Sequence, residues 1–268
     1  MPGRASRRPR VADTMSLGGH LRELRKRMFL AAAGILVGAV LGWVLSGYVW
    51  DALRAPIYTI ATAQHRSAQL NYPDITSAFD LKLKISFYVG MVLSGPVWLY
   101  QIFAFLMPGL TGTEKRYTFG FFFTAVPLFF AGCVAGFYAL PHVVELMTSF
   151  APSQDAALIT AQGYFDFVLK LVVAIGIAFV LPVFIVLLNF AGVISAHSII
   201  KAWRLATLTI ILFTAIATPA ADVISMFLLA IPMVLLYFTA YGIASMHDHR
   251  SAKRALSVST QAEFPSSA

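Results

Sequence analysis

The chain has 268 residues, of which 59% are hydrophobic and 12% charged, and its mean hydropathy is +0.76. Soluble domains usually carry about 25% charged residues. This composition therefore excludes an ordinary soluble enzyme, a disordered chain and a coiled coil, and it predicts an integral membrane protein. The single cysteine, Cys133, excludes an internal disulfide.

Long uncharged runs between the charged residues predict an all-α membrane protein with six transmembrane helices. A helix needs about 20 apolar residues to cross roughly 30 Å of hydrocarbon. The predicted spans are Met28–Trp50, Ile85–Met107, Thr118–Leu140, Phe167–Ala191, Leu205–Ala217 and Val223–Ser245. The fifth span is short, and we expect helices 5 and 6 both to be short.

Lysine and arginine are unequally distributed between the two sides of this predicted membrane domain. Of the 20 basic residues, 15 lie on the side that holds both chain ends, and 5 lie on the other side. The positive-inside rule then predicts that both termini are cytoplasmic. The net charge of +8 follows from this topology and from anionic lipid, and it does not call for nucleic acid as a partner.

Composition also divides the chain into a membrane domain and two tails. Residues 1–19 are rich in arginine and residues 247–268 are small and polar, so we predict a disordered basic cytoplasmic tail and a second disordered cytoplasmic tail. The six-span domain would then occupy residues 20–246. The segment His247-Asp248-His249 at the start of the second tail is expected to be a solvated cluster rather than a metal site.

Prolines within four predicted spans favour a curved, concave bundle, because proline removes a backbone donor and kinks a helix. They are Pro96, Pro127, Pro182 and Pro232. The two long outer loops contain apolar residues, so we expect them to fold back as a cap over the helices.

Small residues at helical spacing predict close contacts between helices, although glycine is also common in membrane spans without such a role. The first span reads Gly34-x-x-x-Gly38-x-x-x-Gly42, and the third contains Gly132-x-x-x-Gly136.

Two carboxylates stand in basic surroundings on the predicted cytoplasmic face. Glu23 lies in HLRELRKR before the first span, and Glu114 lies in GLTGTEKRY in the first inner loop. One interpretation is local neutralisation, by Arg22 and Lys26 or by the basic residues after Glu114. The other is recognition of a cationic ligand, because carboxylates bind guanidinium groups bidentately.

Three further predictions concern polar residues near the membrane. Asp222 either caps the sixth helix or forms a site at membrane depth beside the short fifth helix. Asp166 and Lys170 are four residues apart and are expected to pair. Hydroxyl groups on the fifth helix are expected to bond to a single-span partner helix; they belong to Thr207, Thr209 and Thr214.

Four segments resemble the TatC family, the multispanning subunit of the twin-arginine protein translocase. They are HLRELRKR, SGPVWLYQIFAFLMPGLTGTEKR, FVLPVFIVLL and ATPAADVISMFLLAIPM. The resemblance covers about His20 to Met246. It implies no enzyme, but a receptor and scaffold that binds the Arg-Arg signal peptides of folded proteins and is driven by the proton gradient without a nucleotide or other cofactor.

The resemblance also implies partners and a location. Partners would be TatA- and TatB-type single-span proteins, signal peptides and the lipid bilayer, with self-assembly in a larger complex in a bacterial-type inner membrane. Residues matching the signal-peptide site are Glu23, Arg25, Phe105, Pro108, Leu110 and Glu114. Residues matching structural or partner positions are Pro56, Phe79, Lys84 and Asp222.

Two positions depart from the family pattern. Many members carry a glutamate before the proline of the fourth helix and another late in the sixth helix, where this chain has Val180 and Phe238. A role for acids inside the membrane is therefore not expected from these positions. The alternative function is a small secondary transporter or channel, but such proteins usually show polar residues near the middle of several spans.

Overall fold

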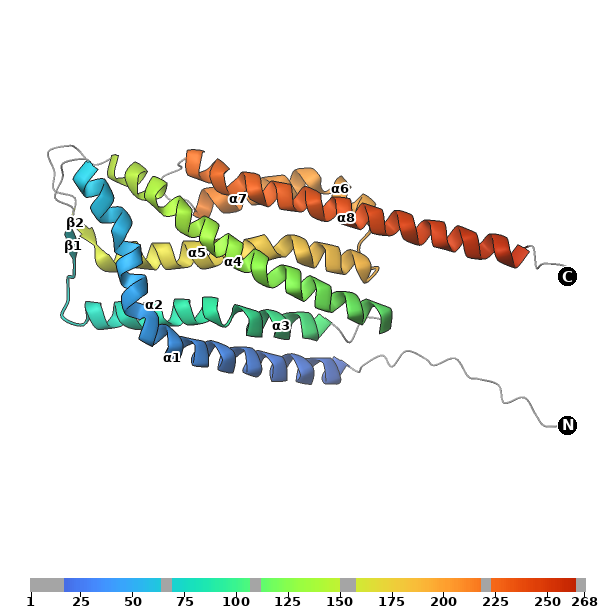
Figure 1. The fold of residues 1–268 in the computed structure, drawn as a ribbon, viewed down its shortest axis with the longest axis horizontal. Coiled ribbons are helices and arrows are strands. Elements are labelled where there is room, and N and C mark those ends of the chain that lie inside the picture. The colour runs from blue at the N-terminus through green and yellow to red at the C-terminus, as the bar shows by residue number, and fades with distance from the viewer. Residues whose placement is uncertain (1–16, 64–68, 107–111, 150–157, 218–222, 264–268) are drawn as a thin grey trace.

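The computed structural model describes residues 17–63, 69–106, 112–149, 158–217 and 223–263. Within these ranges the chain consists of helices joined by short turns, together with one pair of short strands (Figure 1). The elements are α1 (Leu17–Ala63), β1 (Gln69–Asn71), α2 (Ser77–Leu93), α3 (Gly95–Leu106), α4 (Gly112–Ser149), β2 (Leu158–Thr160), α5 (Ala161–Phe190), α6 (Ala196–Lys201), α7 (Trp203–Ala217) and α8 (Val223–Glu263).

The predicted spans correspond to long helices, to one bent pair and to one short helix. Four helices are long and apolar enough to cross a membrane: α1, α4, α5 and α8. The helices α2 and α3 form a further candidate span bent by 54°, and α7 is a shorter apolar helix of 15 residues. The fifth span is thus short as predicted, but α8 has 41 residues, so the prediction of a short sixth helix is wrong.

The bend between α2 and α3 lies at Pro96, as the prolines predicted. α2 ends at Leu93 and α3 begins at Gly95, with the backbone N–H of Trp98 donating to the carbonyl of Ser94. Pro96 has no N–H to continue the ladder, and its ring disfavours the preceding helical turn. Pro127, Pro182 and Pro232 lie inside continuous helices.

The glycine repeats lie where helices approach most closely, which confirms their predicted packing role. A Cβ added to Gly38 would overlap the carbonyl oxygen of Gly90 in α2, and one added to Gly42 would overlap that of Ser86. A Cβ on Gly132 would come within 2.9 Å of the Cα of Gly176 in α5. The backbones of α1 and α2, and of α4 and α5, can approach closely only because these positions lack side chains.

The two long connections predicted as a cap meet in a small parallel sheet that the sequence did not predict. β1 pairs with β2 in the register Gln69–Leu158, Leu70–Ile159 and Asn71–Thr160. At this end Tyr164 donates a hydrogen bond of 2.8 Å to the carbonyl of Leu53, which ties α5 to α1. The start of α1, the start of α4 and the end of α8 all lie towards the opposite end of the molecule (Figure 1).

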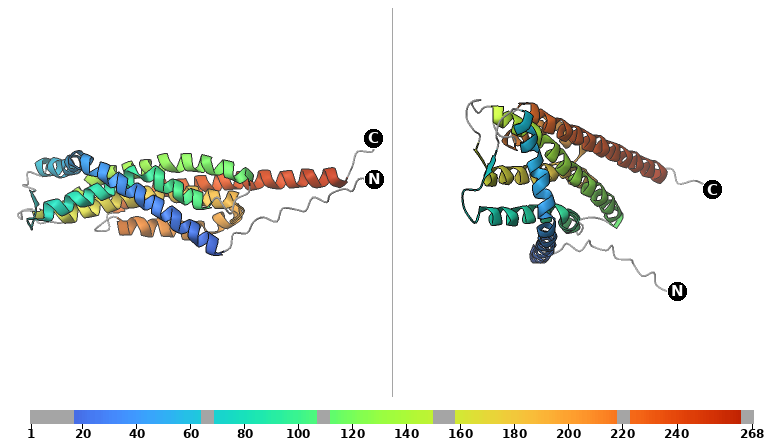
Figure 2. Two further views of the ribbon diagram at one scale, coloured as in Figure 1. Left: turned by 90° about the horizontal axis from the view of Figure 1, so that it is seen from below. Right: turned by 60° about the vertical axis from the view of Figure 1, so that its left-hand side comes forward.

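The core consists of apolar layers along α5. Near the strands, the fully buried Leu81, Ile85 and Phe165 pack together, and towards the other end Phe103 and Phe129 pack with Val180. α8 projects beyond the other helices at the end that holds the start of α1 (Figure 2). The prediction of a disordered tail from residue 247 is therefore wrong as far as Glu263, where this helix ends.

Candidate functional site

The first turns of α1 lie against the last turns of α3 and bring two predicted site residues into one place. The ring of His20 contacts that of Phe105 with 4.5 Å between centroids. About two helical turns further along α1, Nη1 of Arg27 donates a hydrogen bond of 3.5 Å to Oε1 of Gln101 in α3. The segment HLRELRKR thus packs against α3 through His20 and Arg27.

Glu23 lies within this face and is partly shielded from solvent. Its Oε1 is 2.6 Å from Nη2 of Arg27, and the two side chains are 28% and 22% exposed. The predicted neutralisation by Arg22 or Lys26 is wrong, because the helix places Arg27 one turn away on the same side as Glu23. Arg25 lies elsewhere, with its guanidinium 5.7 Å from the centroid of the Phe29 ring.

Glu114 lies in the first turn of α4, so the second predicted acid is at the same end of the molecule as Glu23 (Figure 1). Three other predicted residues, Pro108, Leu110 and Asp222, lie outside the described residues. The two interpretations of Asp222 therefore both stay open.

Three residues predicted as structural or partner positions lie in helices. Pro56 belongs to α1, which continues to Ala63, and the exposed Phe79 in α2 meets the ring of Trp43 at 6.2 Å between centroids. Lys84 also belongs to α2 and forms an ion cluster with two carboxylates.

This ion cluster corrects the predicted pairing of Asp166 with Lys170. Nζ of Lys84 is 3.1 Å from Oδ2 of Asp166 and 3.2 Å from Oδ2 of Asp80. Nε2 of Gln162 donates to the same oxygen of Asp80 at 2.6 Å. Asp166 therefore pairs with Lys84 of α2 rather than with Lys170 of its own helix.

At the opposite end, the predicted solvated cluster around Asp248 is instead a clamp between helices. Oδ2 of Asp248 accepts the backbone N–H of Ala196 at 2.7 Å, and Oδ1 accepts a hydrogen bond from Nδ2 of Asn189 at 3.0 Å. The ring of His247 stacks on Phe190 with 3.8 Å between centroids. This clamp fixes α8 to the end of α5 and the start of α6, and the sequence interpretation missed it.

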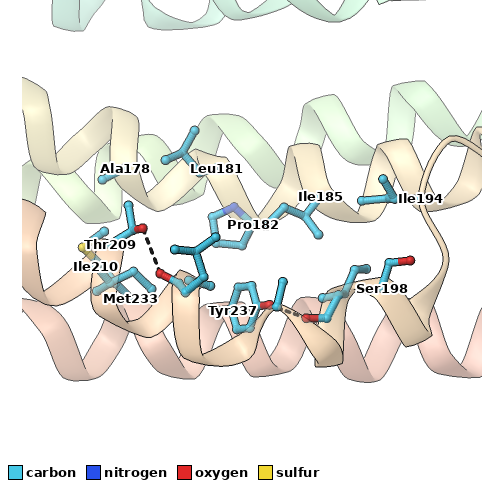
Figure 3. Close-up of a pocket in the computed structure, with 14 residues that line it drawn as sticks. Ala178, Leu181, Pro182, Ile185, Ile194, Ser198, Thr209, Ile210, Met233 and Tyr237 are labelled. Carbon is cyan, nitrogen blue, oxygen red and sulfur yellow. Dashed lines mark hydrogen bonds between the residues drawn. The ribbon is translucent and has the colours of Figure 1, made fainter.

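An apolar cavity of about 430 Å³ lies between α5, α6, α7 and α8. Figure 3 shows Pro182, Thr209, Met233 and Tyr237 around it, with the Tyr237 hydroxyl donating to the carbonyl of Ile199 at 2.6 Å. Val180, at a position where relatives often carry an acid, is 2% exposed and packs in the core beside α3 and α4. Among the described residues that line the cavity, none has an acidic side chain.

Two of the three hydroxyl groups predicted to bond to a partner helix bond to the backbone of α7 itself. Thr214 is fully buried and donates to the carbonyl of Ile210 at 3.0 Å, and Thr209 donates to that of Leu205 at 2.8 Å. Thr214 is buried within this single chain, and the predicted bonds from α7 to a partner helix stay a prediction. Thr207 has a buried hydroxyl without a hydrogen-bond partner among the described residues.

Comparison with known proteins identifies the family. The model of the family described as Sec-independent protein translocase protein (TatC) matches residues 19–232. The chain belongs to the TatC family. It is 41% identical over 253 residues to the TatC protein of Xylanimonas cellulosilytica, a match that covers 94% of this chain and 89% of the relative.

A second TatC protein and a solved structure agree. The protein from Rothia mucilaginosa is 36% identical over 241 residues, covering 90% of this chain and 82% of that protein. A crystal structure described as the twin arginine translocase receptor TatC superposes with a TM-score of 0.71 and 30% identity, covering 85% of this chain and 98% of the other. The predicted family, all-α membrane fold and role in twin-arginine protein transport are therefore confirmed, and the transporter or channel alternative is set aside.

Proposed function

We propose that this TatC chain binds Arg-Arg signal peptides of folded proteins through Glu23 and Glu114 at its cytoplasmic face. The observation that carries the proposal is the position of Glu23, a carboxylate 28% exposed one turn after His20, whose ring contacts Phe105, and at the same end as the first turn of α4. Two acids at one end suit a ligand with two adjacent guanidinium groups.

The orientation and the partners belong to the same proposal. The start of α1 and the end of α8 lie at one end of the molecule, and that side carries most of the basic residues, which supports cytoplasmic termini (Figure 1). Reporter tags at Ser259 should then be cytoplasmic, and tags at Ala68 should be external.

The short helix α7 is the face we assign to single-span partners of the TatA and TatB type. Exposed apolar side chains follow its length at helical spacing, namely Leu205, Leu208, Leu212 and Ile216. Such a stripe suits contact with a lipid chain or with a second apolar helix, and in the proposed assembly the helix of a partner covers it.

The magnitudes separate signal recognition from local charge balance. A hydrogen bond to a charged group contributes roughly 1.5–3 kcal/mol, which corresponds to about one to two decades in affinity. An exposed pair along one helix contributes only about 0.3–0.5 kcal/mol. The proposal therefore requires a loss of at least tenfold when either acid is neutralised.

The test measures the Kd of a fluorescent Arg-Arg signal peptide for the purified protein in lipid nanodiscs. Glu23→Gln and Glu114→Gln should each weaken binding tenfold or more. Asp51→Asn removes an exposed carboxylate further along the same helix as Glu23 and should leave Kd unchanged. If both glutamine variants remain monodisperse and bind the peptide like the unmodified protein, these acids are not the recognition site.

A further inference from the structure

The guanidinium group of Arg27 already forms an ion pair with Glu23, the residue proposed to bind an arginine of the signal peptide. Its Nη2 approaches Oε1 of Glu23 at 2.6 Å, and its Nη1 donates to Oε1 of Gln101 in α3 at 3.5 Å. Among the described residues, Arg27 is the one cation in an ion pair with Glu23. Glu23 is therefore already paired with a guanidinium group, the same chemical group that the proposed ligand would supply.

The guanidinium of Arg27 is incompletely satisfied in this position. Its Nε is buried without a hydrogen-bond partner among the described residues, and its bond to Gln101 is at the long limit of a hydrogen bond. Buried donors without a partner are costly. The pair is consequently held by a single short contact, which another guanidinium can replace.

We propose that Arg27 is a positioning residue that occupies Glu23 in the empty receptor and is exchanged for an arginine of the signal peptide. This inference rests on the proposed function of Glu23. When the signal arginine binds, Arg27 leaves the carboxylate and stays on Gln101. Arg27 thereby keeps Glu23 oriented and protected from other cations, and it lowers the affinity of the receptor for every signal.

Gln101 has a distinct role in this exchange. It accepts from Nη1 of Arg27, whereas Glu23 contacts Nη2, so it offers the displaced guanidinium a partner on α3. Without Gln101 the displaced guanidinium has no acceptor there, and Arg27 returns to Glu23 more readily. The two side chains should therefore affect signal binding in opposite directions.

The experiment measures the Kd of the Arg-Arg peptide for Arg27→Gln in the unmodified background and in the Glu23→Gln background. In the first, Arg27→Gln should tighten binding about two- to fivefold, somewhat above the effect of an exposed helical pair. In the second, that gain should fall to the gain produced by Arg22→Gln. Arg22 is exposed and lies in the same turn, so Arg22→Gln removes one positive charge near the site without touching Glu23.

A second variant approaches the same contact from α3. Gln101→Ala should weaken binding about two- to fivefold when Arg27 is present, and it should have no effect on Kd in the Arg27→Gln background. This pair of measurements tests the exchange of Arg27 if the double variant Glu23→Gln, Arg27→Gln is not monodisperse.

The outcomes distinguish the two proposals. If Glu23→Gln does not weaken binding, the recognition site is wrong and the exchange is wrong with it. If Glu23→Gln weakens binding but Arg27→Gln gives the same gain in both backgrounds, Arg27 acts only through its charge and the exchange is overturned. A loss of affinity in Arg27→Gln would also overturn it, because the pair would then be a structural support.

Discussion

The contact between α1 and α2 can be tested with one substitution placed at two glycines of the same helix. Gly38 is buried against α2, and a Cβ there would overlap the carbonyl oxygen of Gly90. Gly47 is exposed, and a Cβ there would meet nothing within 4 Å. Alanine at either position brings the same gain in helix propensity, so the comparison isolates the steric cost.

The expected free-energy changes have opposite signs. Replacing a helical glycine by alanine stabilises by roughly 0.5–1 kcal/mol when nothing is displaced. Overfilling a packed contact costs about 1–3 kcal/mol, and the obstacle here is backbone, which cannot move aside as a side chain can. Gly38→Ala should therefore be about 1–3 kcal/mol less stable than Gly47→Ala, a difference of about 2–12 °C in apparent Tm for a chain of this size.

The assay compares apparent Tm values by fluorescence-detected gel filtration after heating, in one detergent and at one heating rate, because unfolding of such proteins is often irreversible. Gly90→Ala provides a second variant from the partner helix, since its Cβ would overlap the backbone of Ala39. If Gly38→Ala and Gly47→Ala shift the apparent Tm equally and in the same direction, α1 and α2 are not in contact through this surface.

Two further predictions concern the two ends of the molecule. Asp248→Ala should lower stability by about 1–3 kcal/mol, because the N–H of Ala196 and the amide of Asn189 lose their acceptor. As a control, replacing the exposed His249 by alanine should leave the apparent Tm unchanged. Equal shifts in apparent Tm for the two variants would contradict the clamp. Cysteines at Leu70 and Ile159, which are direct neighbours in the parallel pair, should form a disulfide under mild oxidation, and cysteines at Leu70 and Thr160 should form it much less; equal yields would contradict the register.

The helices were predictable where the physical cause is local. Runs of apolar residues between charges give the spans, Pro96 gives the bend between α2 and α3, and the glycine repeat of α1 gives its face towards α2. Each of these effects acts within one helix or on any neighbour that approaches it, so the sequence can be interpreted without knowing the partner.

The ends were less predictable because their order comes from contacts between distant segments. The sequence around residue 248 is polar, yet Asp248 is held by Asn189 and Ala196, which lie more than 50 residues earlier. Lys84 likewise bonds to Asp166, which lies 82 residues later in the sequence. The strands β1 and β2 pair through only three residues each, which is too short a pattern to predict a strand. The pair of Glu23 with Arg27 was different, because its spacing of four residues in a helix was visible in the motif.

The distribution of polar groups along the molecule supports recognition at one end rather than a path through the interior. Several buried hydroxyls within the helices bond to their own backbone, as Ser46 does to the carbonyl of Trp43 and Ser86 to that of Lys82. Such groups are satisfied and offer nothing to a passing polar chain. Charged side chains gather instead at the ends, and the glycine contact between α1 and α2 holds the end that carries Glu23 against α3. A substitution such as Gly38→Ala should therefore weaken signal binding as well as stability, although Gly38 lies about four helical turns, or roughly 22 Å, from Glu23 along α1.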